Sequence, residues 1–123
     1  MRNDSYTLLD SGSCRKLEQA GKYRIIRPAL NAFWSPSLPE AEWSKADAVF
    51  ERNPTGGGTW TWKTAQPVEW NISWGGLSLL ARPTQFGHLG FFSEQATNWQ
   101  WLRDSIAKMP KGASTLNLFA YSG

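Results

Sequence analysis

Two adjacent glycines near the middle of the chain constrain the fold more than any other feature of the sequence. Gly75 and Gly76 separate two segments, 68–74 and 77–81, and the first of them alternates strictly between apolar and polar residues. A two-residue hairpin loop places both central residues at positive φ, which favours glycine. The loop length also fixes three cross-strand pairs: Trp74 with Leu77, Ile72 with Leu79, and Trp70 with Ala81. The sequence therefore predicts a β-hairpin with one continuous apolar face.

Tryptophan is the most unusual part of the composition. The chain of 123 residues has eight tryptophans and 14% aromatic residues, which argues against disorder. Segment 59–64 alternates and places Trp60 and Trp62 on one face. Strand-borne tryptophans either pack in a core or form an exposed platform for sugars or unpaired bases. The apolar partners Leu77 and Leu79 favour the core.

The rest of the front half indicates short strands and turns within one domain. Segments 6–9 and 23–26 are strand candidates, and the cluster Asp10–Ser13 should stop the first of them. Segment 28–39 carries three prolines around two aromatic residues, so we expect an ordered, irregular loop there.

The charge is mildly basic, with a net charge of +3 and a pI of about 9.2. Such a balance permits contact with phosphate without requiring it. The longest basic stretch contains five cations opposed only by Glu18: Arg15, Lys16, Lys22, Arg24 and Arg27. We interpret it as a solvated strand-and-turn surface, with phosphate contact as the alternative. Lys63 and Arg82 likewise fit ordinary surface charge better than a phosphate site.

Several classes of protein are disfavoured. Cys14 is the single cysteine and His88 the single histidine, so neither an internal disulfide nor a cluster of histidines and cysteines around a metal is expected. The N-terminus lacks the apolar stretch of a secretion signal, and no window approaches eighteen apolar residues. We therefore expect a cytoplasmic protein without a membrane span.

The pattern changes after Phe92. Ser93 suits a helix N-cap and Glu94 the first turn of that helix. The apolar stripe Trp99, Leu102, Ile106 and Met109 predicts a helix that ends near Met109, because Pro110 and Gly112 follow. Segment 114–120 then resembles a buried strand that runs into a glycine-containing turn, an arrangement that presents backbone N–H groups to nucleotides. The fold class predicted is α+β: a β-rich domain over 1–92, then the first helix and strand of a Rossmann-like α/β domain over 93–123.

Two segments resemble motifs of a known family. Residues 116–123, Leu-Asn-Leu-Phe-Ala-Tyr-Ser-Gly, closely resemble the first cofactor motif of the ribosomal-RNA cytosine-C5 methyltransferase-like family. That family belongs to the class I S-adenosylmethionine-dependent methyltransferases. Residues 88–95, His-Leu-Gly-Phe-Phe-Ser-Glu-Gln, resemble its second hallmark, a strand end that leads into a helix beside the methionine part of the cofactor.

The resemblance implies S-adenosylmethionine as cofactor and a set of candidate cofactor-binding residues. These are His88, Gly90, Phe91, Phe92, Glu94, Gln95, Asn117, Phe119, Ala120, Tyr121, Ser122 and Gly123. Two local alternatives stay open: His88 is a packed or surface histidine, and Glu94 and Gln95 only cap the helix. No catalytic residue carries over, because Cys14 lies in the wrong part of the chain to match the family's nucleophile.

The resemblance also implies that the chain is the N-terminal part of such a methyltransferase, acting on RNA in its full-length form. The family carries its ribose-binding acid, adenine pocket and catalytic cysteine beyond the motif with which this sequence ends, so we expect no activity from the chain alone. We further expect exposed apolar surface around helix 93–109 and segment 116–119, which would re-pair with the β-rich part or self-associate. The alternative function is a stand-alone aromatic-rich β module that binds nucleic acid or glycan, and a third is a remnant without a function of its own.

Overall fold

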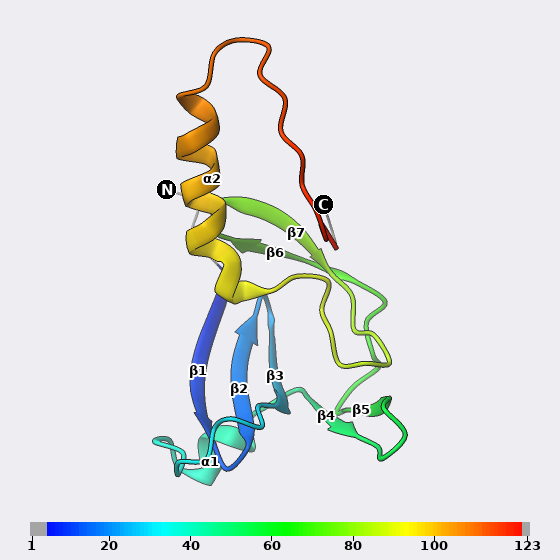
Figure 1. Cartoon of the computed structure of the whole chain (residues 1–123). Helices are drawn as coiled ribbons and strands as arrows, with labels where there is room; N and C mark the ends of the chain where they lie inside the picture. The colour runs from blue at the N-terminus through cyan, green and yellow to red at the C-terminus, as the bar shows by residue number, and fades with distance from the viewer. Residues whose placement is uncertain (1–4, 122–123) are drawn as a thin grey trace.

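The computed structural model describes residues 5–121. Within this range seven strands form two sheets, and there are two helices, the second of which follows directly on one short 3-10 turn (Figure 1). The larger sheet has the strand order β1–β2–β3–β4–β5. Its strands are β1 (Tyr6–Gly12), β2 (Arg15–Ala20), β3 (Tyr23–Pro28), β4 (Ala48–Arg52) and β5 (Gly58–Trp62). The smaller sheet pairs β6 (Trp70–Trp74) with β7 (Leu77–Ala81).

Strand β1 is longer than the sequence indicated. The residues expected to end it belong to the strand, which runs through a bulge between Leu8 and Asp10 and turns only at Ser13 and Cys14. Asp10 points its carboxylate at the loop instead of breaking the strand. Its oxygens accept hydrogen bonds from the backbone N–H groups of Leu38, Ser37 and Ser11 and from the Trp43 indole, so its pKa is lowered. The irregular loop expected over 28–39 is therefore tied to the sheet.

Strands β3 and β4 are parallel, whereas every other neighbouring pair in the larger sheet is antiparallel. A crossover containing the short helix α1 (Glu40–Trp43) connects them. Trp43 at the end of this helix is fully buried and packs with Leu17 and Ile26. The crossover thus covers one face of the sheet.

The β6–β7 hairpin has the predicted register, with Trp74 opposite Leu77, Ile72 opposite Leu79 and Trp70 opposite Ala81. Both loop glycines have positive φ, at 56° and 75°. The buried face of the hairpin joins the main core beside Tyr6, Ala20 and Ile25 from the larger sheet.

The strand-borne tryptophans belong to this core, as the sequence favoured. Trp70 is buried, and Trp60, Trp62 and Trp74 are partly buried against it. The indole N–H of Trp70 donates to the Ala20 carbonyl at 2.9 Å, which joins the hairpin to the larger sheet. These four rings therefore do not form an exposed platform for sugars or bases.

The C-terminal part departs from the prediction at both of its elements. Ser93 lies inside the 3-10 turn η1 (Ser93–Gln95), whose N-cap is Phe92, and the N-cap of the helix that follows is Gln95, so Ser93 is not the helix N-cap that the sequence indicated. Helix α2 (Ala96–Ala107) begins after Gln95 and ends slightly before Met109. None of its residues is buried.

The buried strand predicted over 114–120 is wrong. In the described part of the chain this segment has no strand partner, and Leu116, Leu118 and Phe119 are exposed. It runs back beside α2 toward β7 as irregular backbone (Figure 1). Apolar sequence alone does not make a strand, because the backbone N–H and C=O groups need a neighbouring strand as partner. The expected re-pairing with the β-rich part is also not formed. None of the helices between residues 5 and 121 is long and apolar enough to cross a membrane.

Candidate cofactor and anion pockets

The two segments with hallmark sequences lie against each other although a helix separates them in the chain. The ring of Tyr121 lies 5.2 Å from that of Phe92 and 6.4 Å from that of His88, measured between centroids. Together with α2 and β7 they enclose a cavity of about 560 Å³.

Most of the cavity wall is apolar, with a few polar groups. Phe91, Phe92, Gln95, Asn117, Phe119, Ala120 and Tyr121 from the candidate set line it. The remaining wall comes from Leu118, from β7 and from α2, where the predicted apolar stripe contributes Trp99 and Leu102. A volume of several hundred Å³ with an aromatic lining and few polar groups is typical of a small-molecule site.

The backbone in this wall adopts an uncommon conformation. Phe119 and Tyr121 both have φ of 57°, a left-handed conformation that large side chains rarely occupy. Such residues persist where the surroundings hold them, and they cluster at ligand sites. Phe119 is fully exposed in this structure, so its ring is free to cover a ligand.

The other candidate residues have different positions. His88 and Glu94 face a second pocket, which shares the rings of Phe91 and Phe92 with the first. Gly90, with φ of 99°, lines neither pocket. Ser122 and Gly123 lie outside the described residues.

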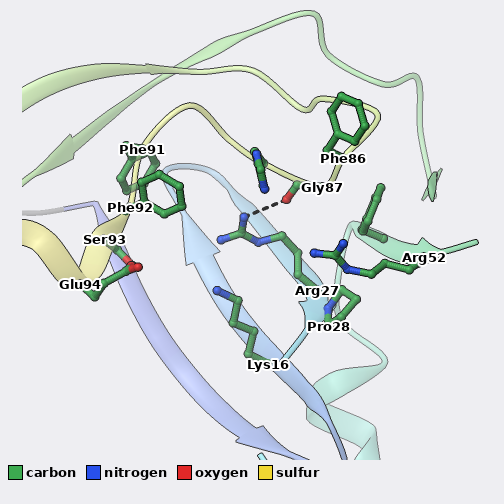
Figure 2. A pocket seen from close by; sticks show the side chains of 12 residues that line it. Lys16, Arg27, Pro28, Arg52, Phe86, Gly87, Phe91, Phe92, Ser93 and Glu94 are labelled. Carbon is green, nitrogen blue, oxygen red and sulfur yellow. Dashed lines mark hydrogen bonds between the residues drawn. The ribbon is translucent and has the colours of Figure 1, made fainter. Parts of the chain in front are cut away.

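The second pocket, of about 200 Å³, is lined by three cations (Figure 2). They are Lys16 from β2, Arg27 from β3 and Arg52 from β4. The interpretation of the basic stretch as a solvated surface is wrong for Arg27, whose side chain is only 12% exposed. Sequence analysis missed Arg52 altogether. Lys16 and Arg27 lie opposite each other on β2 and β3. The alternation of residues along these two strands was the sequence signal that could have predicted this pair of cations.

Glu18, on the neighbouring strand β2 of the same sheet, holds Arg27 in place. Its side chain is completely buried, and its two oxygens accept hydrogen bonds from Arg27 Nε and Nη2 at 2.7 and 2.6 Å. The Tyr6 hydroxyl donates to the same carboxylate at 2.6 Å, and Lys16 Nζ lies 3.2 Å away. A paired arginine is what makes a buried carboxylate tolerable.

The protonation states follow from this network. Burial acts to raise the pKa of Glu18, but the hydrogen bonds and charge of Arg27, together with Lys16, outweigh it and lower that pKa. Burial and the neighbouring Glu18 charge raise the pKa of Tyr6. Burial acts to lower the pKa of Arg27, but Glu18 outweighs it and raises that pKa. Carboxylate and guanidinium are thus both charged at neutral pH.

Gly87 fixes the other side of the guanidinium. Its carbonyl accepts a hydrogen bond from Arg27 Nη1 at 2.9 Å (Figure 2). A Cβ atom at Gly87 would lie 2.5 Å from the Phe50 ring, and φ there is 77°. Only glycine meets both conditions without a shift, so this position couples the loop to the arginine.

Metal chemistry has no candidate site in the part of the chain that the structure describes. No three histidine, cysteine, aspartate or glutamate side chains between residues 5 and 121 are grouped to hold an ion. Cys14 is a free, exposed thiol, distant in sequence from both hallmark segments.

Among the comparisons with known proteins, the one with solved structures is informative. No family model and no curated protein matches the chain. Among solved structures, a SAM-dependent methyltransferase from Agrobacterium tumefaciens matches with a TM-score of 0.80 and 39% sequence identity. The match covers 87% of this chain and 34% of that methyltransferase, so the chain spans about a third of the length of the protein it resembles.

Proposed function

We propose that this chain is part of a class I S-adenosylmethionine-dependent methyltransferase and forms one wall of its cofactor pocket. The observation that carries the proposal is the meeting of segments 88–95 and 116–121 around one cavity. Similarity to a SAM-dependent methyltransferase over 87% of the chain supports it independently of that geometry.

The residues present fit the cofactor in part. The rings of Phe92, Trp99 and Tyr121 suit the adenosine and the positively charged sulphur, which aromatic faces attract. The amides of Gln95, Asn98 and Asn117 suit the amino-acid end. When bound, the cofactor supplies an electrophilic methyl group on sulphur. The work of these residues is to bind and orient it and to keep water from it.

One requirement is unmet within the described residues. No carboxylate between residues 5 and 121 lines the 560 Å³ cavity, so the ribose hydroxyls lack the acidic acceptor that the family resemblance implies. We therefore propose that this chain alone binds the cofactor weakly and transfers no methyl group.

RNA as methyl acceptor is the finer part of the proposal. The cation-lined pocket beside the cofactor wall supports it, since backbone phosphates are recognised by lysine and arginine. The alternative of an aromatic glycan-binding module has little support, because the tryptophans on which it relied lie in the core.

The test is binding of S-adenosylhomocysteine to the chain, observed by ligand-detected NMR. We expect saturation transfer to the adenine and methionine protons, reduced in Phe92→Ala and Tyr121→Ala. Phe33→Ala, an exposed aromatic outside both pockets, is the matched control and should bind as the parent does. Absence of any transfer in the parent chain would refute the cofactor wall.

A further inference from the structure

The cation-lined pocket is a second cavity beside the one that we propose for the cofactor, and its three cations need an explanation of their own. Two of its cations, Arg27 and Lys16, pair with the same buried carboxylate, Glu18. No carboxylate within the described range pairs with Arg52, and Lys16 shares Glu18 with Arg27. With Glu94 also at the rim, three cations face two carboxylates, which leaves one positive charge uncompensated.

The cations of the pocket also have hydrogen-bond donors that no group in the described part of the chain uses. Arg27 uses three of its five N–H groups on Glu18 and Gly87, which leaves two for a ligand or water. Lys16 Nζ makes one ion pair and keeps further donors. Arginine presents its donors in a planar fork that matches the oxygens of a phosphate.

Size and surroundings restrict the ligand further. A volume of about 200 Å³ falls below the 300 Å³ or more that surrounds a drug-sized molecule, but it is large enough for a small anionic group. Phe86, His88 and Phe92 place exposed or half-exposed rings around the cations. Cations beside accessible rings are typical of sites for single-stranded nucleic acid, where rings stack on bases and cations hold the backbone.

We infer that Lys16, Arg27 and Arg52 form a binding site for a backbone phosphodiester of a single-stranded RNA substrate. Its single negative charge would cancel the uncompensated positive charge of the pocket. Because Phe91 and Phe92 line both pockets, the bound strand would run beside the cofactor cavity. This inference rests on the proposed function for its RNA substrate and its cofactor neighbour.

Arg27 is unsuitable as a test residue, because its loss would remove both guanidinium hydrogen bonds from the buried Glu18 carboxylate and destabilise the fold. Lys16→Gln and Arg52→Gln leave the Arg27–Glu18 pair intact. Lys111→Gln removes the same charge from the segment after α2 and is the matched control. Far-UV circular dichroism and thermal unfolding check that all three variants fold.

The measurement is fluorescence anisotropy of a labelled single-stranded RNA oligonucleotide across a range of salt. For a single strand, each phosphate contact contributes about 0.7 to the slope of log affinity against log salt. We expect each pocket variant to lose about 0.7 of slope and roughly fivefold to tenfold of affinity at ~50 mM salt. Lys111→Gln should match the parent chain.

Equal RNA binding by the parent and both pocket variants would overturn the inference, as would an equal loss in Lys111→Gln. An oligonucleotide with a 5′-phosphate distinguishes a terminal phosphate from an internal one. If it outcompetes the 5′-hydroxyl form only when Arg52 is present, the pocket takes a phosphomonoester and the phosphodiester assignment is wrong. S-adenosylhomocysteine binding is measured on the same variants and should be unchanged. A failure of the phosphodiester site is thereby distinguished from a failure of the proposed cofactor wall.

Discussion

The β-rich part and the C-terminal part of this chain have similar apolar content, but the first buries its apolar side chains and the second leaves most of them exposed. Up to β7, tryptophan and isoleucine side chains fill a core between the hairpin and the larger sheet. From Ser93 onward no described helix residue is buried, and Phe119 is 102% exposed. Apolar residues are buried only where a second element offers a complementary face.

The difference also separates stability from binding. The front part supplies the packed core and the fixed Arg27–Glu18 pair. The C-terminal part, together with β7, Phe91 and Phe92, lines the cavity that we propose for the cofactor. Binding segments are commonly drawn from the least stable parts of a protein, because they must rearrange around a ligand. The four predictions below test this division, beginning with the largest effect on stability.

Two tryptophans give the most direct contrast. Trp70→Ala removes a ring that is 7% exposed and should cost about 3–5 kcal/mol of unfolding free energy. Trp101→Ala removes a ring on α2 that is 65% exposed and should change it by less than about 0.5 kcal/mol. Urea unfolding followed by circular dichroism measures both. Similar losses from the two substitutions would remove the distinction between the two parts.

The buried carboxylate is expected to have the next largest effect. Glu18→Gln leaves the Arg27 guanidinium without its counter-charge and should cost about 3 kcal/mol at neutral pH. Glu40→Gln breaks only the exposed pair with Arg15, 3.6 Å apart, and should be nearly neutral.

Glu18→Gln should also change how the unfolding free energy depends on pH. Because folding lowers the pKa of Glu18, its stabilisation is fully present above the unfolded value of about 4.3 and is lost as pH falls through the folded value. The unfolding free energy of Glu18→Gln should therefore fall less steeply below about pH 4 than that of the parent. If the curves of unfolding free energy against pH are parallel for the two proteins, the partners of Glu18 do not lower its pKa on folding.

The loop that carries Gly87 gives an intermediate effect. Gly87→Ala forces both a positive φ and a collision with Phe50, whereas Gly56→Ala, at φ of 96°, meets nothing within 4 Å. Both substitutions place alanine at a positive φ, so the difference between their unfolding free energies isolates the cost of the collision with Phe50. We expect this difference to be about 1–3 kcal/mol. Thermal unfolding of the pair measures it, and equal midpoints would mean that the ring of Phe50 moves aside freely.

The smallest effect on stability is expected in the exposed segment. Leu116→Asp combined with Phe119→Asp should change the unfolding free energy by less than about 0.5 kcal/mol. The same pair should abolish the self-association that we predict from this apolar surface. Sedimentation velocity over a range of concentrations gives the answer. A parent chain that sediments as a monomer throughout would contradict the prediction.

Local patterns predicted the structure where geometry is set by neighbours in sequence. The hairpin is the clearest case, since a two-residue loop determines its own register. Segment 114–120 failed for the opposite reason, because a buried strand depends on partners that sequence periodicity does not supply. The parallel pairing of β3 with β4 was not foreseen either, because the residues that pair are distant along the chain.

The candidate site shows the same limit. Resemblance to two motifs predicted a cofactor wall, and the structure brings seven of the twelve candidate residues to one cavity. The cation-lined pocket was missed because Lys16, Arg27 and Arg52 come from three strands. Arg27 in particular looked like surface charge, and only the burial of its partner Glu18 identifies an anchored arginine.

The single parallel pairing in the larger sheet also determines how the chain folds in time. Strands β1, β2 and β3 are joined by tight turns and make mainly local contacts. Pairing β3 with β4 requires residues 29–47 to close as a loop, and the entropy of that closure is lost before the new contacts form. We therefore expect the three-stranded meander to form first and the docking of β4 and β5 to be slower. During that interval the edge of β3 would be unpaired and open to the same strand of another chain, so we expect newly made protein to be most prone to aggregate then.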